Sequence, residues 1–218
     1  MNNWIKENKH MVILSYVVIL VCIGVGLILW PQLPEQIPTH FDASGTPNGW
    51  SGRFMAVIGL PLILLAVQAL MLFVTKKDPK SENQPAKMNR ILVMIIPILC
   101  VIIQSITLSY GLGHTVKVNV LLTRAMGVLF LLIGNYLPKV RSNYTVGIRL
   151  PWTLADEGNW HATHRVGGFA FAAAGILMLL ASFLKHADRM SIVMLAAVLI
   201  AVLVPSIYSY WYSTKHLS

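Results

Sequence analysis

Residues 11–30 read M-V-I-L-S-Y-V-V-I-L-V-C-I-G-V-G-L-I-L-W, twenty positions without a charged side chain. An α-helix rises about 1.5 Å per residue, so such a run spans a hydrocarbon core of roughly 30 Å. The stretch is longer than the apolar part of a signal peptide, about 7 to 15 residues, and no small-residue cleavage site follows it. We therefore predict a retained transmembrane helix.

Five more apolar runs of similar length follow. They occupy residues 54–74, 91–110, 118–137, 166–184 and 191–211, and within them only Arg124 carries a full charge. The 218-residue chain is 56% hydrophobic and 11% charged, which excludes an ordinary soluble domain. The sequence predicts an all-α polytopic membrane protein with six transmembrane helices. Cys22 and Cys100 lie in the middle of their spans and are expected to behave as small apolar residues.

The Lys and Arg residues predict the orientation, because positively charged loops stay in the cytoplasm. With both termini inside, 12 of the 17 Lys and Arg residues are cytoplasmic, four are outside and Arg124 is in a span. We interpret the net charge of +9 as a consequence of membrane topology and of contact with anionic lipid head groups. We expect no direct nucleic-acid binding. Residues 1–75 are predicted to form a two-helix unit with an extracellular loop at 31–53, residues 76–90 a cytoplasmic hinge, and residues 91–218 a four-helix unit with a cytoplasmic loop at 138–165.

The outer loop has turn-forming residues along most of its length. Residues 33–50 read L-P-E-Q-I-P-T-H-F-D-A-S-G-T-P-N-G-W, in which prolines favour an extended backbone and S-G-T-P-N-G permits tight turns. The loop is either held together by its own turns or binds an extracellular peptide. The candidate peptide-binding residues are His40, Phe41, Asp42, Asn48 and Trp50, together with Arg124 inside the fourth span.

Arg124 lies six residues from the outer end of its predicted span, and Gln104 lies at the same depth of the preceding span. An unpaired guanidinium in lipid costs on the order of 2.5 kcal/mol or more. Arg124 is therefore expected to reach toward the head groups, to pair with Gln104, or to contact a ligand that enters from outside.

The inner loop has the most varied chemistry. Residues 143–168 read N-Y-T-V-G-I-R-L-P-W-T-L-A-D-E-G-N-W-H-A-T-H-R-V-G-G. Thr153 followed by Asp156 resembles a capping box, so a helix is predicted to begin there and to run toward Arg165. Its His, Trp and Arg side chains either anchor an amphipathic helix at the lipid surface or form a docking surface for a cytoplasmic protein. Glu157, His161 and His164 share one face and give a weak alternative zinc site.

These two loops, with G-N-Y-L-P-K at residues 134–139, resemble the SdpI-type immunity family of six-span bacterial membrane proteins. The resemblance implies protection against a sporulation-delaying peptide toxin, in bacterial cannibalism. It also implies signal transduction in which an ArsR-type autorepressor is held at the cytoplasmic face. It implies no cofactor and no enzymatic activity. A membrane metalloenzyme and a peptide exporter stay open as alternatives. The candidate partner-binding residues are Tyr144, Gly147, Arg149, Pro151, Trp152, Thr153, Trp160, His164 and Arg165.

Overall fold

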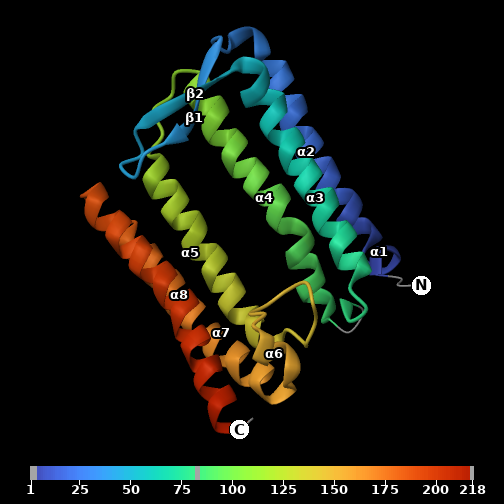
Figure 1. Cartoon of the computed structure of the whole chain (residues 1–218). Helices are drawn as coiled ribbons and strands as arrows, with labels where there is room; N and C mark the ends of the chain where they lie inside the picture. The colour runs from blue at the N-terminus through green and yellow to red at the C-terminus, as the bar shows by residue number, and fades with distance from the viewer. Residues whose placement is uncertain (1–3, 82–83, 217–218) are drawn as a thin grey trace. The chain divides into compact units, whose positions relative to one another are not determined.

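The computed structural model describes residues 4–81 and 84–216. Its helices are α1 (Trp4–Glu7), α2 (Lys9–Leu29), α3 (Leu60–Lys77), α4 (Ala86–Gly111), α5 (Val118–Tyr136), α6 (Pro151–Ala155), α7 (Glu157–Ala181) and α8 (Ala187–His216). Among the described residues, six helices are long and apolar enough to cross a membrane, which confirms the predicted all-α membrane fold. Figure 1 shows these helices as long rods.

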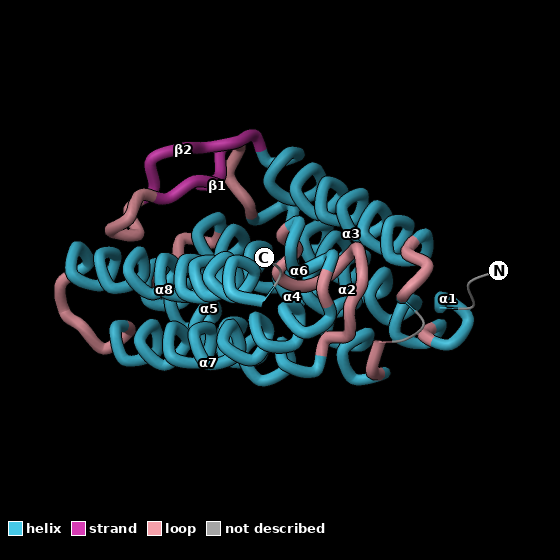
Figure 2. Tube along the Cα trace, turned by 60° about the horizontal axis from the view of Figure 1, so that its bottom comes forward, coloured by secondary structure: helices cyan, strands magenta, loops and turns pink. Residues whose placement is uncertain are grey.

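The outer loop forms the β-structure of this largely helical chain. Strands β1 (Gln36–Phe41) and β2 (Pro47–Gly52) make a two-stranded antiparallel sheet, visible in magenta in Figure 2. The short 3₁₀ turn η1 (Trp30–Gln32) leads into it, and the π-helix η2 (Met55–Gly59) leads from it into α3. In a π-helix the backbone hydrogen bonds run from residue i to residue i+5, and here the Val57 carbonyl also accepts a bond from the Gln104 side chain.

The chain divides into two compact units, and the division differs from the one predicted above. The first unit holds α1 to α4 and the hairpin, with α2, α3 and α4 packed against one another. The helix that follows the 76–90 segment therefore belongs with the N-terminal helices. Ile19, Cys22 and Cys100 form one of the buried clusters that join them.

The second unit holds residues 84–85 and 119–216, with α5 to α8 and the 3₁₀ turn η4 (Leu137–Lys139). Its core contains Phe130, Ala174, Met178, Ala197 and Ala201, from α5, α7 and α8. Small residues let α5 and α7 approach closely: a Cβ on Gly134 would lie 2.6 Å from the Ala172 nitrogen. Close backbone approach through small residues is typical of membrane helices.

Candidate functional sites

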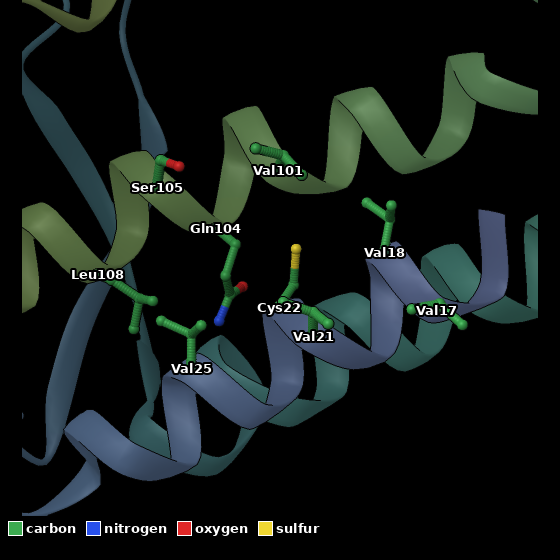
Figure 3. A pocket seen from close by; sticks show the side chains of 9 residues that line it. All are labelled: Val17, Val18, Val21, Cys22, Val25, Val101, Gln104, Ser105 and Leu108. Carbon is green, nitrogen blue, oxygen red and sulfur yellow. The ribbon is translucent and has the colours of Figure 1, made fainter. Parts of the chain in front are cut away.

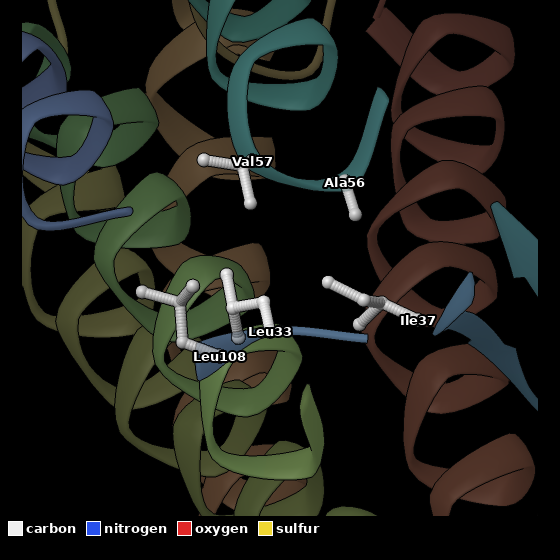
Figure 4. Close-up of a cluster of buried hydrophobic side chains, with 5 residues drawn as sticks. All are labelled: Leu33, Ile37, Ala56, Val57 and Leu108. Carbon is white, nitrogen blue, oxygen red and sulfur yellow. The ribbon is translucent and has the colours of Figure 1, made fainter. Parts of the chain in front are cut away.

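The hairpin is fixed to its unit by a small apolar cluster. Ile37 on β1 is fully buried with Leu33, Ala56, Val57 and Leu108 (Figure 4). Side chains alternate across a strand, so burying Ile37 turns its neighbours away from the helices. The predicted outer loop is thus an ordered element.

The tip of the hairpin is organised by Asp42. Its Oδ1 accepts hydrogen bonds from the Ser44 backbone N–H at 2.9 Å, the Ser44 hydroxyl at 2.6 Å and the Thr46 N–H at 3.0 Å. These bonds favour the charged form, so they hold the pKa of Asp42 below its ordinary value. Gly45 completes the turn at a φ of 84°. Asp42 therefore has a structural role at the tip.

The other outer candidate residues differ in how much of their side chain is available to a ligand. The His40 ring Nδ1 lies 2.6 Å from the Asn48 Oδ1, so these two side chains are hydrogen-bonded to each other across the strands. The Phe41 ring packs at 5.1 Å from that of Tyr110. Trp50, opposite Pro38, keeps 57% of its surface exposed. Trp50 is therefore the outer candidate with the most surface to offer a ligand.

Arg53 closes the base of the hairpin, a role that the sequence analysis did not assign. Its backbone N–H donates to the Glu35 carbonyl at 2.8 Å, and its Nε donates to the Pro34 carbonyl at 3.0 Å. The guanidinium lies over the Trp30 ring, 5.5 Å from the centroid. Its position directly after the turn-rich segment was the available signal.

The inner loop is built around Asn143, a residue that the sequence analysis also passed over. Its Nδ2 donates to the Arg141 and Val146 carbonyls at 2.8 and 2.9 Å, and its Oδ1 accepts from the Thr145 and Val146 N–H groups. Asn often folds the following backbone in this way. Gln84 adds two bonds to the Arg141 backbone.

His164 connects this loop to α7. The Ile148 N–H donates to the His164 Nε2 at 3.0 Å, and the Nδ1 lies 2.7 Å from the Trp160 carbonyl. Because Nε2 accepts, Nδ1 carries the proton and the imidazole is neutral. Trp160 stacks on the ring at 4.0 Å and donates from Nε1 to the Val140 carbonyl at 2.8 Å. Both side chains are fully buried, so they hold the loop from within.

Gly147 fits this arrangement for a steric reason. Its φ is 115°, in a region that side chains rarely adopt, and a Cβ there would overlap the His164 Nε2. The glycine lets the backbone pass directly over the His–Trp stack.

The predicted helix that begins near Thr153 and runs toward Arg165 consists of two helices in the structure. Thr153 is buried inside α6, where its hydroxyl accepts the Leu150 N–H at 2.8 Å. Asp156 caps α7 instead, its Oδ2 accepting the Asn159 N–H at 2.6 Å. Asp156 has an extended backbone, with φ −133° and ψ 120°, which separates the helices. The fifth span accordingly begins at Glu157.

Trp152 is tied to the last helix through a polar cluster. Its Nε1 donates to the Ser209 hydroxyl at 2.7 Å, and that hydroxyl donates to the Asn159 Oδ1 at 3.0 Å. The Asn159 Nδ2 returns a bond to the Ser209 carbonyl at 3.0 Å, and Thr163 donates to the same amide oxygen. The sequence signal was a set of polar residues in otherwise apolar helices.

Four inner candidates are exposed: Tyr144, Arg149, Pro151 and Arg165. The Arg149 guanidinium donates to the Tyr144 carbonyl, which orders it while leaving its remaining donors available. Guanidinium and phenol groups are common anchors of protein interfaces. These four residues, called the inner face below, are the part of the loop that another molecule can touch.

Arg124 on α5 and Gln104 on α4 belong to different units, and each makes a hydrogen bond within its own unit. The Arg124 Nε donates to the Ser182 hydroxyl at 3.1 Å, and its guanidinium lies 5.3 Å from the centre of the Phe183 ring. Gln104 donates to the Val57 carbonyl at 3.3 Å. Each side chain thus has a partner within its own unit.

The zinc alternative loses its central ligand. Both ring nitrogens of His164 are engaged by backbone groups, whereas a metal needs a free lone pair. Glu157 and His161 are both exposed. Within residues 4–81 and 84–216, no group of three or more His, Cys, Asp or Glu residues is placed to hold a metal.

The sequence matches known families over both loops. The SdpI/YfhL protein family matches residues 139–209, which include the inner loop, α7 and much of α8. A domain of unknown function, DUF1648, matches residues 17–65, which include the hairpin.

Related proteins extend this match. "Immunity protein SdpI" of Bacillus subtilis (strain 168) is 26% identical over 205 residues, covering 91% of this chain and 94% of the relative. An uncharacterized protein of Archaeoglobus fulgidus is 36% identical over 67 residues, covering 28% of this chain and 36% of that protein. No solved structure matches the chain. Six apolar helices and this relationship identify a multi-pass protein of the bacterial membrane. The chain thus matches the SdpI/YfhL protein family over residues 139–209, and it is similar to an immunity protein along nearly its whole length.

Proposed function

We propose that this protein is an integral membrane immunity protein that makes its cell resistant to an extracellular toxic peptide. The observation that carries the proposal is the alignment with an immunity protein across both ordered loops. The protein acts by binding, without a covalent step. The hairpin is its outer surface, with Trp50 as the exposed aromatic anchor.

The rigidity of the hairpin favours this role. Ile37 fixes its base, Asp42 fixes its tip, and Arg53 closes its ends. A preformed surface loses little conformational entropy when a ligand binds, so more of the contact energy appears as affinity. A flexible tether of the same composition would lack this advantage.

We further propose that the inner face holds an ArsR-type autorepressor at the cytoplasmic side. Three candidate span helices, α3, α4 and α5, follow the hairpin and precede the inner loop in the chain, and if each crosses the membrane the two loops face opposite sides. Arg149 and Arg165 supply positive charge, and Tyr144 an exposed ring. When the hairpin binds toxin outside, the inner face would hold the repressor at the membrane. The repressor would then be kept away from its operator.

The immunity proposal is tested by expressing the chain in a host killed by purified sporulation-delaying peptide. We expect a higher peptide dose at half survival than in the same host making an unrelated six-span membrane protein at equal abundance. The matched host controls for membrane load. Equal doses in the two hosts would refute the immunity role.

A further inference from the structure

A groove in the first unit lies between α2 and α4 (Figure 3). Its volume is about 280 Å³, near the lower end for ligand pockets, roughly 300 Å³. Apolar side chains form most of its wall, with Cys22 and Val25 on α2 and Val101 and Leu108 on α4. The groove therefore admits one large side chain rather than a length of peptide.

The wall also holds two polar side chains, Ser105, which is exposed, and Gln104, whose amide oxygen is buried. Gln104 is 3% exposed, and among the described residues its Oε1 accepts no hydrogen bond. The orientation of the amide is determined by the π-helix, because the Val57 carbonyl can only accept and so faces the Nε2 at 3.3 Å. Oε1 is the acceptor that remains. Figure 3 shows the Gln104 side chain extending from α4 toward Cys22 and Val25.

A buried acceptor without a donor is unfavourable, and a ligand that brings a donor removes that penalty. The ligand must also suit an apolar wall. An indole ring meets both conditions, since it has a large apolar body and an N–H that only donates. A hydroxyl would add an acceptor with its own need for a donor.

Depth separates a peptide from a lipid as the occupant. Gln104 is seven residues before Gly111, the last residue of α4, which is roughly 10 Å at about 1.5 Å per residue. Acyl chains at that depth carry no donor, and the donors of phospholipids are in the head groups. A side chain on a peptide that has entered the bilayer can supply a donor there.

We propose that this groove, called the Gln104 groove, binds a tryptophan side chain of the membrane-inserted toxic peptide, with the indole N–H donating to the Gln104 Oε1. The proposal rests on the immunity function and adds a second recognition point inside the membrane. The hairpin would meet the peptide in water, and the Gln104 groove would hold one of its side chains in lipid.

The test uses a synthetic Leu/Ala-rich membrane-spanning peptide with a single Trp about 10 Å from one end of its span, a depth taken from the helix rise. A terminal dye on the peptide reports binding to the full chain in nanodiscs. Replacing the Trp by 1-methyltryptophan removes the N–H and keeps the ring. We expect binding about fivefold weaker, as for one lost hydrogen bond. No binding, or equal binding of the two peptides, would overturn the proposal.

Two variants locate the effect. Gln104→Leu should bind the Trp peptide about as weakly as the wild type binds the methylated one, and should no longer distinguish the two. Gln68→Leu is the matched control: Gln68 is also buried, but it donates to Ser15 and Val93 outside the groove. Its fivefold discrimination should persist. Discrimination that survives Gln104→Leu would assign the indole to another site.

Two outcomes distinguish the remaining possibilities. A phospholipid retained by the wild type and lost from Gln104→Leu in native mass spectrometry would make lipid the occupant and overturn the proposal. Survival assays separate the groove from the function on which it rests. A wild-type chain that gives no protection refutes the immunity role, whereas full protection by Gln104→Leu refutes only the groove.

Discussion

Single residues hold the inner loop against α7, and Gly147 is the most constrained of them. Its backbone lies in the left-handed region, over the His164 ring. We expect Gly147→Ala to lower the free energy of unfolding by about 1–3 kcal/mol, through backbone strain and loss of the Ile148–His164 bond. Thermal unfolding in detergent, with protease cleavage of residues 138–150, measures the effect.

Gly24 provides the control for this change. A Cβ at Gly24 would meet nothing within 4 Å, and the residue lies inside α2, where Ala is favoured over Gly. Gly24→Ala should leave stability equal or slightly raised. Equal effects at both glycines would contradict the steric account of the loop.

Asp42 predicts a pH dependence for the hairpin tip. Its folded pKa is below the ordinary 3.8, so the folded tip binds fewer protons than the unfolded one. The stabilising contribution is fully present above about pH 4 and is lost as the pH falls through the lowered pKa. Amide exchange of Ser44 and Thr46 should accelerate at low pH relative to the pH trend of Asp42→Asn. Parallel trends in the two proteins would show that the carboxylate does not order the tip.

The candidate site was only partly predictable at this scale. The motif drew attention to Thr153, Trp160 and His164, which the structure buries, as well as to Arg149, which it exposes. Residue type alone does not show whether a side chain bonds within the protein or is available to another molecule. Asn143 and Ser209 were missed because their importance depends on bonds to backbone or to distant side chains.

At the scale of elements, hydropathy predicted the six spans because each is long and apolar enough to cross the hydrocarbon core of a membrane. The hairpin was predicted only as ordered turns. Its strands are six residues long and include Pro38, Pro47 and two glycines, so no alternation was visible. The start of α7 was placed nine residues late, at 166 instead of 157, because its first turns are polar.

Asp156 determines where α7 begins, and its removal should be measurable. We expect Asp156→Ala to cost about 1 kcal/mol, since the Asn159 N–H would lose its capping acceptor. Thermal unfolding of the detergent-solubilised chain gives the value. Glu157→Ala, one residue further and exposed, is the matched control and should change stability by less than half as much. A larger loss of stability in Glu157→Ala than in Asp156→Ala would show that Asp156 is not the capping residue of α7.

At the scale of the whole molecule, the roles of both proposed surfaces depend on which loop faces out. The distribution of Lys and Arg predicts cytoplasmic termini. An alkaline phosphatase fusion at Asn48 should be active and one at Lys80 inactive, because that enzyme folds only in an oxidising compartment. Green fluorescent protein at the same positions gives the reciprocal control. Inverted activities would reverse the two proposed surfaces.

Separation of the two surfaces also requires variants that leave the fold intact. Trp50 and Arg149 suit this purpose better than a half-buried residue because each is exposed, although Arg149→Ala also removes the bond to the Tyr144 carbonyl. Trp152 does not, because Trp152→Ala would remove the bond to Ser209 and loosen the loop itself. Abundance in the membrane must be equal for every variant compared.

The most direct test of the two-surface account measures toxin survival and membrane recruitment of a labelled repressor in the same cells. We expect Trp50→Ala to lower the peptide dose at half survival by several-fold, the loss of one interface anchor of about 1–2 kcal/mol. Arg149→Ala should abolish recruitment and keep most of the protection. Unchanged survival in Trp50→Ala together with unchanged recruitment in Arg149→Ala, at matched abundance, would contradict the account.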